Sequence, residues 1–389
     1  MKIGIVTLVS DNYGNKFQNY AVEQLLSEYG EVVTYQVENR RATVEGQYES
    51  ALKKLTPTRI SESISARLMN YYDITNARRS ALGNLMYFLT HKNQIQSARA
   101  LRHQKFAAYQ QEFLHISDRV ITAENCREEH WNQSHDYFVC GSDQIWNPYY
   151  GTTSELAFLS FASERSVALA PSFGVSQVGE EKKEQLSCWI SDVKNLSVRE
   201  EAGRQIIKDL TGRDAEVLLD PTMAILPSCW EALAQSPDVK LPEKYILTYF
   251  LGRMTDSYYH RIRKVSEETG LPVVNLFNIE QPEYYSLDPN EVLYAIRNAD
   301  LVLTDSFHGT VFSILFRRSF LVFRRNEGGK SMHSRLANLL GKFGLEDRLD
   351  DGGSAPGPVA DEKWAQVGET ILQERQRTRT YLKKALNKE

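Results

Sequence analysis

The sequence has few cysteines, four in 389 residues, and none of them forms a C-x-x-C pair. This scarcity excludes a disulfide scaffold and a zinc framework, so we expect no metal site and a reducing, cytoplasmic location. No apolar run reaches the ~18 residues that a membrane-spanning helix needs. Internal repeats, low-complexity tracts and a G-x-G-x-x-G fingerprint are also absent, and the last absence argues against a Rossmann dinucleotide site.

The net charge is small as well, −4 at pH 7, but it conceals two basic regions. Ten Lys and Arg residues between positions 53 and 105 stand against two acidic ones, which gives +8. Between positions 317 and 335, six basic residues stand against one acidic residue, which gives +5. On an otherwise acidic chain these regions predict anionic partners at two places, and we expect no nucleic acid among them.

The region 53–105 interrupts the first half of the chain. Its apolar residues at helical spacing are Leu82, Leu85, Met86 and Leu89. This pattern predicts an amphipathic helix with arginines nearby. Two interpretations stay open: a helical insertion that packs on its own protein, with the basic residues solvated, or a surface that contacts anionic lipid or a lipid pyrophosphate at the inner face of the plasma membrane.

Length and alternating patterns predict a two-domain α/β fold. At roughly 150 residues per domain, the chain should contain two domains. Helix-period stretches separate short β-branched runs, which indicates βα units and mainly parallel sheets. Prolines interrupt residues 220–242, so we place the domain boundary there. The first domain is then 1–225, the second 240–360, and a closing helix follows at 361–389.

The strongest candidate motif lies at 299–316. An apolar strand ends there in Thr-Asp-Ser, and a helix begins near Gly309. His308 therefore lies at a strand-to-helix turn, where helix N-termini bind phosphate. A lone histidine is more often structural, but the glycine beside it lets a ligand approach the backbone. The basic run 324–335 follows the next strand, and we expect it to face the same cleft.

Three other loops carry polar residues near helix starts or strand ends. Segment 11–20 opens a helix with a turn in which a glycine is flanked by asparagines, which needs no ligand but can hold an anion or a hydroxyl. After the strand at 137–140, Asp143 either caps a helix or activates a hydroxyl, and Trp146 is either core or a face for a sugar ring. Arg199 either pairs with its neighbouring carboxylates or offers a bidentate fork to a carboxylate or phosphate.

In this order the motifs resemble those of the polysaccharide pyruvyltransferase family, over nearly the whole chain. The matching segments are 12–15 with Gln18 and Ala21, 141–147, 170–174, 197–200, 219–222, 304–310 and 334–336. The resemblance implies two Rossmann-like domains facing a cleft, in a glycosyltransferase-B-like arrangement. It also implies transfer of the pyruvyl group of phosphoenolpyruvate to two hydroxyls of a hexose, which forms a cyclic ketal and releases phosphate. The acceptor would be a cell-surface polysaccharide precursor, a lipid-linked oligosaccharide.

The resemblance further implies roles for single residues. His308 would be phosphate ligand or acid, Arg199 would hold an anionic end of the donor, and Asp143 joins them as a catalytic residue. The other donor contacts would come from Ser306, Gly309, Thr310, Arg325, Lys330 and Arg335. Acceptor contacts would come from Asn12, Tyr13, Asn15, Gln18, Gln144, Trp146 and Asn147. Phosphoenolpyruvate is a co-substrate here, and no cofactor is expected.

The chain departs from the family at one position, where some members carry an arginine and this chain carries Ser306. Two alternative functions therefore stay open. A nucleotide-sugar-dependent glycosyltransferase would also use two α/β domains and a basic cleft. A non-catalytic glycan-assembly protein would keep the fold without the reaction.

Overall fold

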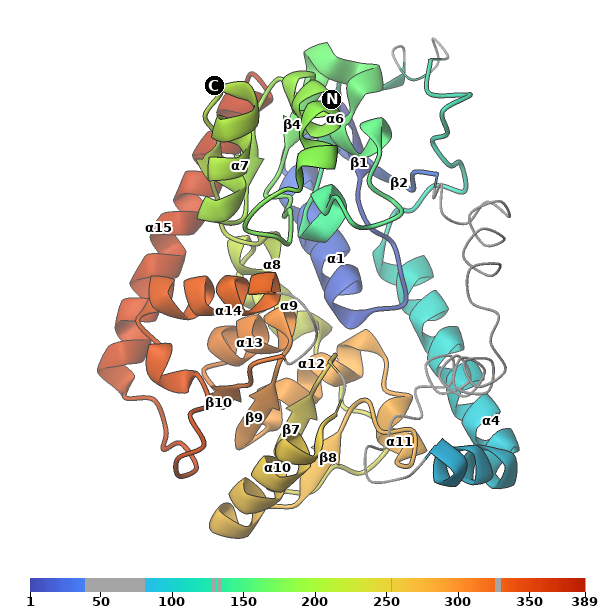
Figure 1. Ribbon diagram of the computed structural model, residues 1–389, viewed down its shortest axis with the longest axis vertical. Helices are drawn as coiled ribbons and strands as arrows, with labels where there is room; N and C mark the ends of the chain where they lie inside the picture. The colour runs from blue at the N-terminus through green and yellow to red at the C-terminus, as the bar shows by residue number, and fades with distance from the viewer. Residues whose placement is uncertain (39–80, 128–130, 132–133, 253, 326–329, 389) are drawn as a thin grey trace.

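The computed structural model describes residues 1–38, 81–127, 131, 134–252, 254–325 and 330–388. Over these residues the chain forms two Rossmann-like α/β halves, each built on a parallel sheet of four strands. Figure 1 shows the first sheet in the upper part of the molecule and the second in the lower part. The predicted fold class, α/β with two parallel sheets in a glycosyltransferase-B-like architecture, is confirmed.

Both sheets have the same strand order, β2-β1-β3-β4 in the first and β8-β7-β9-β10 in the second. The strands are β1 (Lys2–Val6), β2 (Glu31–Tyr35), β3 (Tyr137–Cys140), β4 (Ser166–Ala168), β7 (Ile246–Tyr249), β8 (Val273–Asn275), β9 (Leu301–Thr304) and β10 (Ser319–Val322). The short pair β5 (Ser197–Val198) and β6 (Glu216–Val217) extends the first sheet through a bridge from Val167 to Asn195. In each sheet the order reverses between the first and third strands, and ligands of such sheets bind at that switch point.

Helices cover the sheets and join the halves. They are α1 (Tyr13–Ser27), α4 (Ala81–Phe113), α6 (Glu180–Ser191), α7 (Glu201–Thr211), α8 (Pro221–Ala224), α9 (Pro227–Leu233), α10 (Asp256–Thr269), α11 (Pro282–Tyr285), α12 (Pro289–Asn298), α13 (Phe307–Leu315), α14 (Lys330–Phe343) and α15 (Asp361–Ala385). Short 3₁₀ turns lie at η2 (Asp143–Trp146), η3 (Glu155–Phe158), η4 (Ser160–Arg165) and η5 (Glu346–Arg348).

One apolar cluster extends through both halves. Phe17 of α1 packs on Phe312 of α13 with ring centroids 4.7 Å apart, and Trp230 of α9 packs on the same ring at 4.9 Å. Buried aromatic pairs of this kind stabilise a fold beyond the area they remove from water. Because α1 belongs to the first half and α13 to the second, this packing holds the N-terminal ends of the two helices together.

The segment 220–242 is more regular than the sequence predicted. Helices α8 and α9 occupy much of it, and each begins with a proline. Proline suits the first helical position because an N–H there has no partner inside the helix. Met223 and Trp230 are fully buried, so this segment belongs to the shared core, and the prediction of a stretch without regular structure is wrong. The limits 1–225 and 240–360 remain our proposed domain boundaries.

The basic region 53–105 is helical from residue 81 onward, as α4, and residues 53–80 lie outside the described part of the chain. Helix α4 packs against α11 and α12 of the second half (Figure 1). Arg102 donates from Nη1 to the hydroxyl of Tyr13 at 2.6 Å and to the carbonyl of Tyr285 at 2.7 Å. This part of the region therefore packs on its own protein, as one of the two interpretations expected.

The two described residues of the apolar stripe that suggested the helix do not face the core. Met86 and Leu89 are 53% and 58% exposed, and the side chains of Leu82 and Leu85 lie outside the described part. Buried residues of α4 begin further along, at Ile95. The helix was thus predicted correctly, although Met86 and Leu89, two of the four residues behind the prediction, are exposed.

The C-terminal segment forms the predicted closing helix, α15. Its buried residues include those on which the prediction rested: Trp364, Val367, Ile371, Leu382 and, just beyond the helix, Leu386. The helix returns from the second half to the first along one side of the molecule (Figure 1). There the hydroxyl of Tyr381 donates to the carbonyl of Ala168 in β4 at 2.8 Å. None of the described helices combines the length and the apolar character that crossing a membrane requires.

Candidate functional site

The loops that follow β1 and β3 meet at the switch point of the first sheet. Asn12 caps α1, because its side-chain oxygen accepts from the backbone N–H of Gly14 at 2.8 Å. The side-chain amide of Asn15 donates to Oδ2 of Asp143 at 2.6 Å. The Asp143 side chain is 16% exposed. The structure thus brings the predicted catalytic carboxylate together with the predicted acceptor-side turn.

The loops that follow β7 and β9 meet in the same way in the second sheet. The buried carboxylate of Asp305 accepts from the backbone N–H groups of Leu251 at 2.7 Å and Gly252 at 2.9 Å. Nε of Arg325 lies 3.2 Å from Oδ2 of the same carboxylate. Arg325 was predicted to contact the donor, and its guanidinium is engaged by Asp305, the residue that joins these two loops.

The two switch points touch at Gly14 and His308. Ser306 caps α13 by accepting from the N–H of Gly309 at 3.3 Å, which places His308 in the first turn of the helix. A Cβ atom added to Gly14 would overlap with Nδ1 of His308. Glycine is therefore needed at position 14 for the start of α1 to lie against this imidazole. His308 is buried, with 6% of its surface exposed.

Behind His308 lies a chain of buried charges. Oδ1 of Asp220 is 3.8 Å from Nε2 of His308, and Oδ2 accepts from Nη1 of Arg199 at 2.6 Å. The other nitrogens of Arg199 approach two more carboxylates, with Nη2 at 3.6 Å from Asp143 and Nε at 3.8 Å from Glu200. Arg199 is thus both ion-paired and central to the site, and it connects the predicted catalytic residues.

Several polar atoms of this cluster have no hydrogen-bond partner among the described residues. These atoms are Nε and Nη2 of Arg199, Nε2 of His308 and Oε2 of Glu200. A buried polar atom left unpaired costs about 1–3 kcal/mol, so such atoms are uncommon in structural roles. A ligand that supplied acceptors to the nitrogens would recover this energy.

A cavity of 470 Å³ adjoins the cluster and lies between the two halves. Residues of the first half that line it are Arg199, Glu200, Glu201, Val217, Leu219 and Asp220. Residues of the second half that line it are Phe307, Arg335, Ala337, Asn338, Leu339, Gly341 and Lys342. Its volume lies within the usual range for small-molecule sites.

Arg335 at this cavity is 6% exposed. Burial lowers its pKa to about 10, and the neighbouring charge of Arg199 acts in the same direction. With its amide oriented to present the oxygen, Gln144 accepts from Nη2 of Arg335 at 3.1 Å. Two buried guanidiniums this close repel one another, so their arrangement favours an anion beside them.

Burial lowers the pKa of His308 below its usual 6.5, although Asp220 and Asp143 oppose the effect. Burial would raise the pKa of Asp220, but His308 and Arg199 outweigh it, and the pKa lies below 3.8. The pKa of Arg199 is raised, because Asp220 and the other two carboxylates outweigh its burial. At neutral pH the free site therefore contains a neutral imidazole beside a carboxylate-bound guanidinium.

The lowered pKa of His308 predicts that the protein loses stability as pH falls through 6.5. Near this pH the imidazole of His308 takes up a proton in the unfolded chain but not in the folded protein. Its contribution to the free energy of unfolding therefore declines by up to about 1.4 kcal/mol for each pH unit of acidification. The contribution of Asp220 to the free energy of unfolding is fully present above pH 3.8, so it stays constant between pH 5 and 8. Urea midpoints between pH 5 and 8 would show a slope that is smaller in His308→Gln. Equal slopes in both proteins would contradict the prediction.

Three predicted acceptor contacts lie inside the protein. Trp146 is fully buried and stacks on Phe158 with ring centroids 4.6 Å apart, so the core alternative is correct and the sugar-stacking prediction is wrong. Tyr13 is fully buried, and its hydroxyl donates to a backbone carbonyl at 2.6 Å. Gln18 is also buried and accepts from Thr7 at 2.9 Å. These side chains support the site from within and do not face a ligand.

The remaining predicted residues are placed as follows. Thr310 is fully buried, and its hydroxyl donates to the carbonyl of Ser306 at 3.0 Å. Asn147 is buried beside η2, where its side-chain oxygen accepts from the N–H of Tyr149 at 3.0 Å. Lys330 begins α14, but its side chain lies outside the described part of the chain.

Sequence reasoning missed Asp220, Glu200 and Phe307 as site residues. The ring of Phe307 lies 4.4 Å from the guanidinium carbon of Arg199, a cation–π contact. Asp220 precedes Pro221 and caps α8, whereas its sequence context predicted the start of a proline-interrupted domain boundary. Its position in segment 219–222, which resembles a motif of the family, was the one available indication of a second role. Among the described residues no group of His, Cys, Asp and Glu side chains is arranged to hold a metal ion.

Comparison with known proteins gives the following similarities. S. aureus MnaA in complex with UDP shares 10% identity with a TM-score of 0.44, covering 99% of this chain and 91% of that one. The UDP-GlcNAc 2-epimerase of Neisseria meningitidis shares 10% identity with a TM-score of 0.41, covering 96% and 100%. A mutant O-GlcNAc transferase of Thermobaculum terrenum shares 13% identity with a TM-score of 0.38, covering 100% and 63%. No curated protein matches the sequence.

The family described as polysaccharide pyruvyl transferase matches residues 12–327, which include the motif loops of both halves. The matched range contains Asn15, Asp143, Arg199, Asp220 and His308, the residues that meet around the contact between α1 and α13. This chain therefore belongs to the polysaccharide pyruvyl transferase family.

Proposed function

We propose that the protein transfers the pyruvyl group of phosphoenolpyruvate to two hydroxyls of a hexose, which forms a cyclic ketal and releases phosphate. The observation that carries the proposal is the set of buried nitrogens of Arg199 and His308 that have no hydrogen-bond partner among the described residues. Arg199 lines the cavity between the halves, and His308 lies behind Asp220, which also lines it. Phosphoenolpyruvate carries a phosphate and a carboxylate a few bonds apart. Guanidinium forks bind both kinds of group, and Arg199 and Arg335 supply two.

The charges around the cavity predict how the donor is taken up. The carboxylates of Asp143, Glu200 and Asp220 outnumber the guanidiniums of Arg199 and Arg335, and His308 is neutral when the site is empty. A phosphate dianion beside His308 raises the pKa of the imidazole, as any close opposite charge does. Donor binding at neutral pH should therefore take up a proton onto His308.

The proton on His308 then serves the chemistry. Transfer of this proton to the methylene carbon of phosphoenolpyruvate leaves a cationic centre at C2, which the first sugar hydroxyl attacks. The C2–phosphate bond breaks, phosphate leaves, and the second hydroxyl closes the ring. Asp143, held by Asn15, would accept the proton of the first hydroxyl, and His308, neutral after its transfer, would accept the proton of the second. Arg199 and Arg335 would stabilise the leaving phosphate.

The acceptor is proposed to be a hexose of a cell-surface polysaccharide precursor, carried as a lipid-linked oligosaccharide on the cytoplasmic side of the plasma membrane. Asn12 and Asn15 lie at the start of α1, on the first-half side of the contact with His308, where an acceptor would enter. The exposed Met86 and Leu89 of α4 offer an apolar surface for peripheral contact with an anionic membrane.

The test is phosphate release from phosphoenolpyruvate in the presence of galactose- or N-acetylmannosamine-containing acceptors. We expect release that depends on the acceptor, together with a proton uptake on donor binding that calorimetry in buffers of different ionisation enthalpy would measure. Release of a nucleotide from a nucleotide sugar, with none from phosphoenolpyruvate, would favour the glycosyltransferase alternative. Binding without turnover of either donor would favour a non-catalytic assembly protein.

A further inference from the structure

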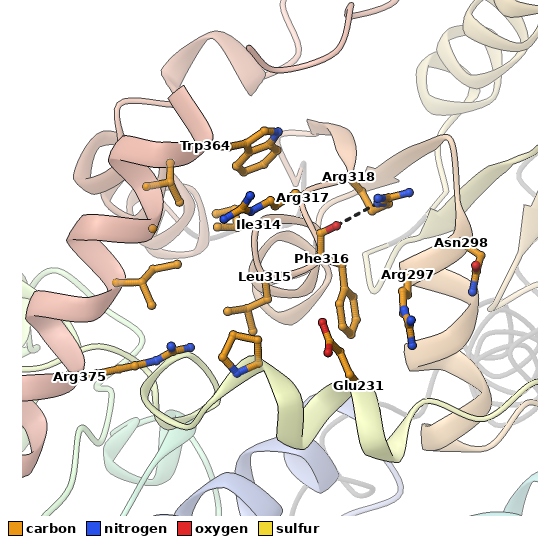
Figure 2. A pocket seen from close by; sticks show the side chains of 14 residues that line it. Glu231, Arg297, Asn298, Ile314, Leu315, Phe316, Arg317, Arg318, Trp364 and Arg375 are labelled. Atoms are coloured by element: carbon orange, nitrogen blue, oxygen red, sulfur yellow. Dashed lines mark hydrogen bonds between the residues drawn. The ribbon is translucent and has the colours of Figure 1, made fainter. Parts of the chain in front are cut away.

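A second cavity, of 710 Å³, lies at the opposite end of α13 from His308. It is open to solvent on one side and is lined by the turn between α13 and β10 and by helices α9, α12 and α15 (Figure 2). The nine residues of α13 separate it from the cluster around Arg199, a distance of about 12 Å along the helix. Nothing in the proposed reaction uses it.

The first feature of this cavity is a buried arginine. Arg375 of α15 is 7% exposed, and its Nε donates to the carbonyl of Met223 at 2.8 Å. Its Nη2 is buried and has no hydrogen-bond partner among the described residues. Figure 2 shows the side chain pointing from α15 into the space between the helices. A buried N–H donor that lines a cavity without a partner is suited to an acceptor brought by a ligand.

The second feature is the charge of the lining. Arg297, Arg317 and Arg318 join Arg375 around the cavity, and the described lining opposes them with a single carboxylate, that of Glu231. Arg318 donates from Nε to the carbonyl of Phe316 at 3.0 Å, which fixes its orientation (Figure 2). Four guanidiniums around one space are typical of a phosphate site, because their planar forks match the oxygens of phosphate and diphosphate.

The third feature is a glycine inside α15. Gly368 lies in the middle of a helix of 25 residues, where glycine weakens the helix relative to alanine. A Cβ atom at this position would come near one atom only, Nη2 of Arg317 at 3.9 Å, so it would point into the cavity. Glycine at position 368 therefore keeps open the space between α15 and Arg317.

We propose that this cavity binds a phosphorylated organic ligand. Its phosphate or diphosphate lies between Arg375, Arg317 and Arg297, and its apolar part lies against Trp364 and Leu315. Trp364 is 6% exposed and faces the same space as these arginines (Figure 2). The lining thus combines an apolar wall with guanidiniums from α12, α15 and the turn after α13. The site is separate from the cluster around His308.

Isothermal titration calorimetry with three probes tests the proposal: inorganic pyrophosphate, uridine diphosphate and geranyl diphosphate. We expect at least one to bind the full-length protein at millimolar concentration or below. Gly368→Met, which fills the cavity, and Arg317→Gln, which removes one fork, should each weaken that binding by about tenfold or more. Tighter binding of uridine diphosphate would indicate a nucleotide ligand, and tighter binding of geranyl diphosphate a lipid diphosphate.

Two variants serve as controls. Arg263→Gln removes an exposed arginine of α10 that pairs with Glu267, so it alters the net charge by the same amount and should leave binding unchanged. His308→Gln should also leave binding at this cavity unchanged, which separates it from the donor site. Absence of binding for all three probes would overturn the proposal. Binding that survives both Gly368→Met and Arg317→Gln would overturn it as well.

Discussion

Replacing His308 with glutamine is expected to lower kcat for phosphate release from phosphoenolpyruvate by about 10²- to 10⁴-fold while the protein stays folded. A positioned general acid or base contributes a factor of this size. Glutamine retains a hydrogen-bonding group near Asp220 and about the same volume, but it cannot carry a proton to the methylene carbon. Steady-state assays at saturating donor and acceptor would measure the loss, and thermal unfolding would confirm the fold.

The matched control for this variant is His260→Gln, which replaces an exposed histidine on α10. It should retain the kcat and KM of the unaltered protein. A His308→Gln variant with normal kcat and a raised KM for phosphoenolpyruvate would assign His308 to donor binding alone. A variant with both constants unchanged would contradict any role of His308 in the reaction.

The sequence predicted the local structure around the site better than the contacts that assemble it. The asparagine-flanked glycine at the start of α1 was visible as a turn that opens a helix. The reason that Gly14 must be glycine is the imidazole of His308, which belongs to the other half of the chain. No spacing within one segment encodes such a contact, because it depends on how the two sheets pack.

The ambiguity of Arg199 has the same origin. Its neighbours in sequence suggested either an ion pair or a fork for an anion, and the structure combines the two. Nη1 is bound to Asp220, while Nε and Nη2 remain without a hydrogen-bond partner among the described residues. Asp220 also caps α8, where it accepts from the N–H of Thr222 at 3.0 Å. One carboxylate can serve as cap and as ion-pair partner because it has two oxygens.

Burial was the second property that local patterns could not supply. Trp146 follows a strand end, where a ligand-facing aromatic residue and a core residue look alike. Helix α4 was predicted as an insertion of the first half, yet Arg102 binds the second half and the start of α1 together. The centroids of four aromatic rings lie within 5.3 Å of the guanidinium carbon of Arg102. A count of charges over 53–105 does not distinguish this arginine from one on the surface.

Replacing Arg199 with methionine is expected to destabilise the protein by about 3–5 kcal/mol, the usual cost of removing one partner of a buried ion pair. Asp220 would then be a fully buried carboxylate facing Glu200 and Asp143 with the cation between them removed. Methionine fills much of the same space, so the loss reports charge more than volume. Urea unfolding at neutral pH would measure it.

Arg204→Met is the control for this variant, because Arg204 on the following helix is 44% exposed and pairs with Asp214 at 2.7 Å. Removing such a surface pair should cost far less, because solvent screens both charges. The double variant Arg199→Met/Asp220→Asn should be more stable than the sum of its single changes predicts, because it also removes the charge left behind. The cost of Arg199→Met should shrink as pH falls below 3.8 towards the lowered pKa of Asp220 in the folded protein, because a protonated Asp220 no longer needs the cation. If Arg199→Met costs no more than Arg204→Met, the three carboxylates do not need this guanidinium, and Arg199 would be a ligand contact without a structural role.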